Sequence, residues 1–320
     1  MIDYSQLLHY CSIAFAVGVN SVGVGIGEGR ASVAALKAIN QQPSAQNAIG
    51  KVAIIGTALI ETSAVLGLFT AIILFRNPLP ETNALYVAIA EVGCALAIGL
   101  SGFIVGIVSS FPTEQSCYSI ARQPFFSNKI LNLTLLTQSI IQSPLIFSFL
   151  VLLFIKTQAA TITTLADSVR YLSSGLCIGL GSIGPAIGLA IFAKNACKSI
   201  GINRHVYGKI LTFSIISLAI IETPIIFALL ISLVLAIISI PTTNMITTIA
   251  AMLAAGICMG LGTLFPGISS GKVASKACIQ IAYRPDAHPI VSRVSMLAQG
   301  LIDTCAIYAL LISLMIAILR

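Results

Sequence analysis

The chain has 320 residues, of which 57% are hydrophobic and only 8% are charged, whereas roughly 25% of residues are charged in a soluble protein. This composition, with a mean hydropathy of +1.02, excludes an ordinary soluble domain, and the length suffices for about eight membrane spans. The net charge of +7 does not indicate nucleic-acid binding, because the basic residues form no runs with interleaved aromatic residues.

The first apolar span extends from about Leu7 to Leu36 and is rich in glycine. Its glycines lie at positions 18, 23, 25, 27 and 29, with Glu28 among them. Small residues let membrane helices approach each other closely, so we expect a closely packed inner layer of helices. A polar link follows at residues 40–44.

The second span, from about Ala48 to Phe75, carries Glu61 near its middle. A carboxylate at the bilayer centre costs at least ~2.5–3.5 kcal/mol, which makes it a functional-site hypothesis. Glu28 and Glu61 lie 15 and 18 residues from Pro43, so their depths in the membrane would differ by only ~5 Å. Two acids at matching depth can share a proton or hold a cation.

The same plan recurs three more times along the chain. The positions equivalent to Glu61 are Gln142, Glu222 and Asp303, at intervals of 81, 80 and 81 residues. The positions equivalent to Glu28 are Ser109, Leu189 and Ser270. We therefore predict an all-α transmembrane fold of eight helices in four tandem hairpins, at residues 1–80, 81–160, 161–241 and 242–320. The second hairpin lacks the carboxylate.

The distribution of Lys and Arg predicts one orientation for all four hairpins. Thirteen of the seventeen basic residues lie at or near the links inside hairpins, and four (Arg76, Lys156, Arg170 and Arg320) lie at the opposite ends. The positive-inside rule then places the links in the cytoplasm and both termini outside. The N-terminal segment has an acid and no basic region, so we expect no cleavable signal peptide.

Other chemistry finds little support in the sequence. The eight cysteines form no CxxC pair and mostly lie in apolar runs, so we interpret them as packing residues. His205 and His288 belong to basic links and have no partners at metal-ligand spacing. No phosphate-binding loop is present. We expect no catalytic residues, no cofactor and no metal beyond a transported Na⁺.

Several of these segments together resemble the c-subunit (proteolipid) family of rotary F-type and V-type ATP synthases. They are the glycine run 23–29, the links Gln41-Gln42-Pro43 and Ala121-Arg122-Gln123-Pro124, and the runs that begin at Glu61, Glu222 and Asp303. The resemblance covers nearly the whole chain, four times over. The Arg-Gln-Pro link is similar to the F-type, whereas fused hairpins are more familiar from the V-type.

The resemblance implies a rotor ring that is built from further copies of this chain and turns past a stator a subunit in a bacterial inner membrane. The ring itself is not catalytic, but couples ion flow to the ATP chemistry of other subunits. Carried over by position, Glu61, Glu222 and Asp303 would bind the ions. The links would meet the central stalk through Gln42, Pro43, Arg122, Gln123, Pro124, Arg284 and Pro285.

The transported ion stays open between H⁺ and Na⁺. A hydroxyl follows each marked position, at Thr62, Ser143, Thr223 and Thr304, and this hydroxyl with a polar residue at the place of Glu28 resembles the sodium type. Against sodium, Leu189 offers no ligand, and a membrane threonine commonly bonds only its own helix. Pro144 and Pro224 would free the carbonyl groups of Ile140 and Ile220, and in the sodium type the carbonyl two residues before the acid is a ligand.

Gln142 departs from the family pattern. An amide does not titrate, so the second hairpin either carries no ion or only supports a neighbouring site. The alternative function is an eight-helix secondary transporter or channel, which would need a substrate cavity and broken helices aimed at one site. A purely structural pairing of the three acids is a further possibility, which their fixed spacing disfavours.

Overall fold

The computed structural model describes residues 4–158, 161–238 and 245–319, and all its regular elements are helices. The bounds of the helices follow for hairpins 1 to 4 in turn. Hairpin 1 has α1 (Tyr4–Gln41), the 3₁₀ turn η1 (Pro43–Ala45) and α2 (Gln46–Arg76). Hairpin 2 has α3 (Ala84–Val108), α4 (Ser110–Arg122), η2 (Pro124–Phe126), α5 (Ser127–Ile141) and α6 (Ser143–Thr157). Hairpin 3 has α7 (Leu165–Ile202), η4 (Arg204–Val206) and α8 (Tyr207–Ile237). Hairpin 4 has α9 (Met245–Gly262), α10 (Leu264–Tyr283), η5 (Pro285–Ala287) and α11 (His288–Leu319).

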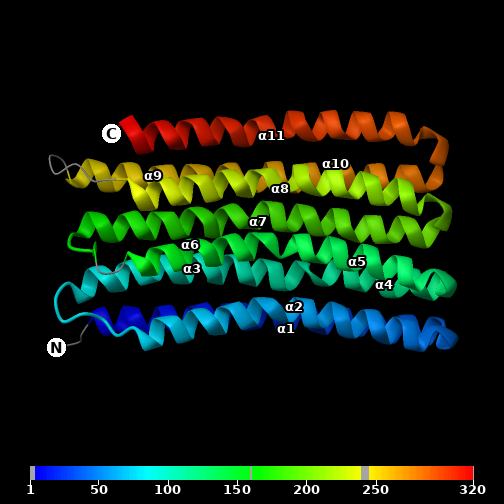
Figure 1. Cartoon of the computed structure of the whole chain (residues 1–320), viewed down its shortest axis with the longest axis horizontal. Coiled ribbons are helices and arrows are strands. Elements are labelled where there is room, and N and C mark those ends of the chain that lie inside the picture. Colours follow the sequence, from blue (N-terminus) through cyan, green and yellow to red (C-terminus); the bar gives the residue numbers. More distant parts are fainter. Residues whose placement is uncertain (1–3, 159–160, 239–244, 320) are drawn as a thin grey trace.

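The prediction of eight membrane-length helices in four hairpins of one orientation is confirmed. Within the described residues, eight helical segments of 34 to 39 residues are long and apolar enough to cross a membrane. All four link turns lie at one end of the molecule, opposite the end where the chain begins and stops (Figure 1). The ends that we predicted for hairpin 2 at residue 160 and for hairpin 3 at residue 241 lie outside the described residues.

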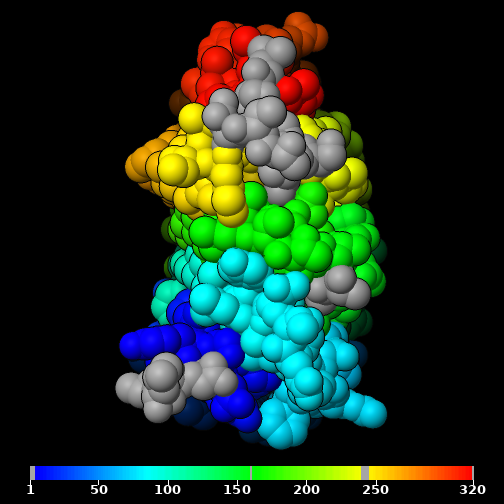
Figure 2. Space-filling model, turned by 90° about the vertical axis from the view of Figure 1, so that its left-hand side faces the viewer, coloured from blue at the N-terminus to red at the C-terminus, as the bar shows by residue number. Residues whose placement is uncertain are grey.

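The hairpins stack side by side in sequence order, as the end-on view shows (Figure 2). The first helices form a continuous row in which α1 packs on α3 and α4, these pack on α7, and α7 packs on α9 and α10. Of the second helices, α2, α5 with α6, and α8 each cover the first helices of their own and a neighbouring hairpin, whereas α11 packs on α9 and α10 of its own hairpin and on α8. This arrangement gives three junctions between consecutive hairpins, which we call the first, second and third junctions.

Glycine allows the row of first helices to pack backbone against backbone. A Cβ atom built on Gly188 of α7 would collide with the carbonyl oxygen of Gly267 on α10, and one on Gly27 of α1 with that of Gly106 on α3. No side chain fits between these helices, since both partners at each crossing present backbone. The predicted close packing of the glycine-rich first helices is therefore present in the structure.

A single methyl group at this contact is expected to be destabilising. Gly188→Ala should lower the free energy of unfolding by ~1–3 kcal/mol, because overpacking forces α7 and α10 apart. Gly208→Ala on α8 is the matched control, since nothing lies within 4 Å of the Cβ position there. Thermal unfolding of both variants in detergent checks this. Equal unfolding temperatures would show that the α7–α10 contact yields without cost.

Three of the membrane-length segments contain a one-residue break near their middle. The breaks fall at Ser109 between α3 and α4, at Gln142 between α5 and α6, and at Thr263 between α9 and α10. A proline follows each break by two or three residues, and proline removes the N–H that would continue the helical bonding. Pro224 does not have this effect: α8 continues through it without a break. Hairpin 2 is thus interrupted in both of its membrane-spanning segments.

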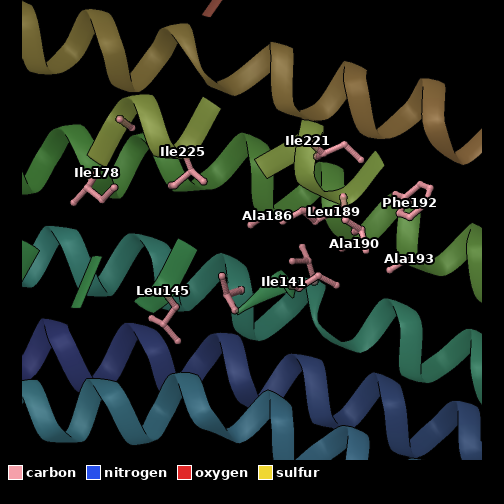
Figure 3. Packing of buried hydrophobic residues seen from close by; sticks show 14 of the residues in the cluster. Ile141, Leu145, Ile178, Ala186, Leu189, Ala190, Phe192, Ala193, Ile221 and Ile225 are labelled. Atoms are coloured by element: carbon pink, nitrogen blue, oxygen red, sulfur yellow. The ribbon is translucent and has the colours of Figure 1, made fainter. Parts of the chain in front are cut away.

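The interior between hairpins 2 and 3 is apolar at the same depth. Ile141 of α5, Leu189 of α7 and Ile221 of α8 are fully buried members of one cluster (Figure 3). Ile141 and Ile221 immediately precede Gln142 and Glu222 in the sequence. Gln142 and Glu222 therefore lie at the edge of an apolar core.

Candidate functional site

The four marked residues lie mid-way along the second helices, but their surroundings differ. Glu61 on α2 is exposed, Glu222 on α8 is half-buried, and Gln142 and Asp303 are each only 7% exposed. Glu28 on α1 is half-buried and close enough to Glu61 for their charges to interact. The structure thus brings the two acids of hairpin 1 near each other.

At the first junction, Gln142 joins hairpins 1 and 2 through its side-chain amide. Its Nε2 donates to the carbonyl oxygen of Leu59 on α2 at 2.9 Å and to Oγ of Ser109 at 3.1 Å. Its Oε1 accepts from Oγ1 of Thr62 at 3.0 Å. The Thr62 hydroxyl also lies 2.8 Å from the Leu59 carbonyl oxygen, so its one hydrogen is shared between two acceptors.

These four residues define a pattern that the repeat carries to the other junctions. The earlier hairpin contributes a backbone carbonyl and a hydroxyl (Leu59 and Thr62), and the later hairpin contributes the marked residue and its partner on the first helix (Gln142 and Ser109). Glu61 lines a groove at the outer opening of the first junction, beside Thr62 and Gln142. Its walls are otherwise apolar.

The third junction has the same plan with a carboxylate in place of the amide. Asp303 and Ser270 occupy the places of Gln142 and Ser109, while Ile220 and Thr223 occupy those of Leu59 and Thr62. Among the described residues, neither Oδ1 of Asp303 nor Oγ of Ser270 has a hydrogen-bond partner, although both atoms are buried. The side chain of Asp303 is one methylene shorter than that of Gln142, which explains why it does not reach across. A buried oxygen without a donor is costly, so this junction fits a proton or a cation.

The second junction is the least polar of the three. Glu222 makes no hydrogen bond or ion pair with any other described residue. Its partner position on the first helix is the fully buried Leu189, and the neighbouring hydroxyl, Oγ of Ser143, is buried without a partner in the part of the chain that the structure describes. With the Ile140 carbonyl at the place of Leu59, this junction has one side-chain oxygen group fewer than the third, which suits a proton better than a cation that needs several oxygen ligands.

The two ends of the stack carry the halves of one more junction. Hairpin 1 has the later-hairpin half, Glu28 and Glu61, and hairpin 4 has the earlier-hairpin half, the Leu301 carbonyl and Thr304. Oγ1 of Thr304 donates to the Leu301 carbonyl at 2.7 Å, and Leu301 is 72% exposed. Neither half finds its complement within the described chain.

The threonine hydroxyls all bond their own helices in the described structure. Thr223 donates to the carbonyl of Ala219 at 3.1 Å, and Thr62 and Thr304 each approach the carbonyl three residues before them. Only Thr62 also reaches across a junction. Since their hydrogens face backbone carbonyl groups, these hydroxyls could bind an ion only through the lone pairs of their oxygens.

The predicted stalk-contacting residues all lie at the link end of the molecule. Arg122, Gln123 and Pro124 line a surface hollow together with the link of hairpin 3, and Phe125 beside them is fully exposed. Gln42 bonds Ser44 within its own turn at 2.9 Å, and Pro43 and Pro285 each begin a 3₁₀ turn, the latter directly after Arg284.

Some link residues tie neighbouring hairpins together instead of facing outward. Nε2 of Gln123 donates to the carbonyl oxygen of Gly201 at 3.0 Å, and Nδ2 of Asn203 donates to that of Ala282 at 3.2 Å. These two hydrogen bonds occupy equivalent positions of the repeat and connect hairpin 2 to hairpin 3 and hairpin 3 to hairpin 4. The Gln123 amide is thus at least partly a structural group.

Sequence reasoning missed two ion networks, each centred on an acid of a first helix. At the end opposite the links, Glu91 of α3 is only 2% exposed and bonds Nδ1 of His9 at 2.5 Å and Nζ of Lys156 at 2.9 Å. Nearer the links, Glu114 of α4 lies 3.0 Å from Nε of Arg30 and 3.7 Å from Nζ of Lys194. The available signal was an acid outside the repeat of marked positions, but its partners are distant in the sequence: His9, Arg30 and Lys194 lie on other hairpins, and Lys156 lies on the other span of hairpin 2.

Comparison with known proteins agrees with the repeat. The sequence profile of the ATP synthase C-subunit family matches residues 11–74, 172–235 and 253–316, which together make up more than half of the chain. These segments contain Glu61, Glu222 and Asp303 and lie in hairpins 1, 3 and 4.

Curated relatives match one hairpin length at a time. The ATP synthase c-subunit 2 of Cereibacter sphaeroides is 43% identical over 74 residues, which is 23% of this chain and 89% of the relative. The ATP synthase c-subunit of Dehalococcoides mccartyi is 46% identical over 70 residues, or 22% and 92%. That of Thermotoga petrophila is 38% identical over 64 residues, or 20% and 75%. These matches do not favour the alternative of a transporter or channel. The chain is a multi-pass membrane protein that belongs to the c-subunit family of ATP synthases, with four tandem hairpins of which three match the family profile.

Proposed function

We propose that this chain is a rotor subunit of the membrane part of a rotary ATP synthase, and that it carries H⁺ or Na⁺ on Glu61, Glu222 and Asp303. The observation that carries the proposal is the recurrence of one carboxylate at mid-membrane depth in three of four hairpins, with Asp303 buried and its Oδ1 without a partner among the described residues. Family membership supports the same conclusion.

The carboxylates do their work by changing charge. An ionised carboxylate is costly in contact with lipid, whereas a carboxyl that has bound H⁺ or Na⁺ is neutral and can rotate through the bilayer. Release requires water access and a stabilising charge on another subunit, which would be the stator a subunit. Each hairpin that carries an acid therefore moves one ion per passage, and rotation couples that movement to ATP chemistry elsewhere.

The junctions differ in which ion they suit. By the repeat, the third junction would bring together the oxygens of Asp303, Ser270 and Thr223, a ligand set that suits Na⁺. The second junction offers Glu222 and Ser143 beside the apolar Leu189, which is suited to a proton. Since one ring passes one stator, a single ion must serve all sites, and the proton needs the fewest ligands.

The ring itself follows from the two unmatched ends. A second copy would bring its Leu301 carbonyl and Thr304 against Glu28 and Glu61 of the first copy and so complete the fourth junction. If further copies of this chain alone build the ring, the number of hairpins is a multiple of four.

The basic links support the predicted orientation. Arg122 and Arg204 line one surface hollow at the link end, next to the exposed Phe125. We propose that this end faces the cytoplasm of a bacterium and meets the central-stalk subunits, with both termini on the outer side of the inner membrane.

Carbodiimide labelling of the purified protein, with and without Na⁺, tests the proposal. Carbodiimides attack protonated, buried carboxyl groups, so peptide mapping should find label at positions 61, 222 and 303. Suppression by Na⁺ would identify a sodium rotor, and label that follows pH alone would identify a proton rotor. If none of the three positions is labelled in a protein that is still folded, they are not ion carriers and the proposal fails.

A further inference from the structure

Gln142 is the one marked residue that cannot titrate, and it is also the best bonded. Both hydrogens of its amide and its oxygen have partners at 2.9 to 3.1 Å, and the residue is 7% exposed. The equivalent Asp303 has the same exposure and an oxygen that lacks a partner in the described residues. The difference is therefore in how the junction is filled, not in how deeply the residue is buried.

We propose that the side-chain amide of Gln142 takes the place of the transported ion at the first junction, which is thereby closed permanently and exchanges no ion. The inference rests on the proposed rotor function, because it assigns the first junction a role relative to the ion-carrying ones.

The contacts of the Gln142 Nε2 atom support this replacement of the ion by the amide. The nitrogen is a hydrogen-bond donor, like the proton of a carboxylic acid, and its hydrogens carry partial positive charge, which oxygen atoms attract as they attract a cation. It lies between a backbone carbonyl oxygen of hairpin 1 and a hydroxyl oxygen of hairpin 2. An ion bound between a carboxylate at position 142 and the same oxygens would meet the same partners.

A second glutamine one helical turn earlier reinforces the closure. Nε2 of Gln138 donates to the carbonyl oxygens of Gly56 on α2 at 2.8 Å and of Ser109 at 3.2 Å, and its Oε1 accepts from Thr113 at 3.3 Å. The equivalent residue at the third junction, Gln299, reaches Ser217 only at 3.4 Å, and its Oε1 is buried without a partner among the described residues. The first junction is thus fully bonded where the third is not.

The closure has a consequence for the rotor. Hairpins 1 and 2 pass the stator as one unit with a single exchangeable acid, Glu61, and the hydrogen bonds across their junction need not break. Three ions then move for every four hairpins. The ring therefore transports fewer ions per turn, while its circumference stays the same.

The test is a Gln142→Glu variant in the full chain, purified as the assembled ring. The glutamate is nearly the same size as glutamine and keeps the oxygens around it, so it should create a fourth ion site. Carbodiimide label at the marked positions should rise from three to four per chain, with new label at position 142 that Na⁺ or alkaline pH suppresses in parallel with label at position 303. Ser139→Glu is the matched control and should not gain protected label, because the Ser139 side chain is exposed and bonds the Leu135 carbonyl of its own helix.

A second variant keeps the proposal falsifiable if the glutamate variant folds poorly. Gln142→Met preserves shape but leaves the Leu59 carbonyl and Ser109 without the amide, and it should lower the unfolding temperature of the ring by at least ~2 °C. The proposal is overturned if position 142 stays unlabelled in a folded Gln142→Glu ring, or if Gln142→Met is as stable as the parent. Label at position 303 in the same samples tests the rotor function separately, so failure of the closure and failure of the function are distinguishable.

Discussion

Replacing Glu222 with Gln is expected to abolish most coupled ion transport, with a loss on the order of 100-fold. Gln142 already leaves hairpin 2 without an acid, so the variant would have two adjacent hairpins that carry no ion. A neighbouring carboxylate would then have to travel further through lipid before an ion neutralises it. At ~2.5–3.5 kcal/mol for a charge at the bilayer centre, that step slows by about two powers of ten.

Asp303→Asn is the informative comparison for this prediction. It removes the same number of acids but leaves Glu61 and Glu222 on either side of each neutral hairpin, so every gap keeps the one-hairpin length that the parent ring already tolerates. We expect ions per chain to fall from three to two while rotation continues. ATP-driven ion uptake by inverted vesicles measures both variants. Equal losses in the two would show that the spacing of the acids has no effect.

Replacing Glu91 with Leu is expected to cost about 3–5 kcal/mol of stability. Glu91 is 2% exposed and neutralises Lys156, which is 11% exposed in its side chain, while also bonding His9. Removing Glu91 leaves the charge of Lys156 buried and unpaired in a medium of low dielectric constant, which is strongly destabilising. Chemical or thermal unfolding in detergent should show the loss, with no change in the mapped carbodiimide sites.

A double variant separates a stranded charge from a general packing defect. Glu91→Leu combined with Lys156→Met removes both charges and should recover most of the lost stability, because replacing a whole buried pair with apolar residues is often neutral. If the double variant is as unstable as Glu91→Leu alone, the Lys156 contact is not the source of the effect.

The fold was largely predictable because the repeat constrains it. A spacing of 81, 80 and 81 residues between Glu61, Gln142, Glu222 and Asp303 places each at the same point of the same helix and predicts four copies of one hairpin. The Lys and Arg residues at the links predict one orientation for all four. The glycines of the first helices predicted close packing, which Gly188 and Gly267 show at backbone contact.

The chemistry of the junctions was less predictable, since it depends on groups that the sequence does not mark. Gln142 was expected either to carry nothing or to support a neighbour, and the sequence left these open because one of its partners is the backbone carbonyl of Leu59 on another helix. The interruption of both spans of hairpin 2 was not predicted either. The His9–Glu91–Lys156 network joins non-equivalent positions of the repeat, so comparing hairpins at a constant offset does not reveal it.

The most direct test of the account is native mass spectrometry of the purified membrane protein after saturating carbodiimide treatment. A rotor ring built from this chain should appear at an integer multiple of 33.4 kDa, well above a monomer or dimer, and should carry up to three additions per chain that map to positions 61, 222 and 303. A species that remains monomeric or dimeric under conditions where the complex is active, or one that takes up no label at these positions, would contradict the account.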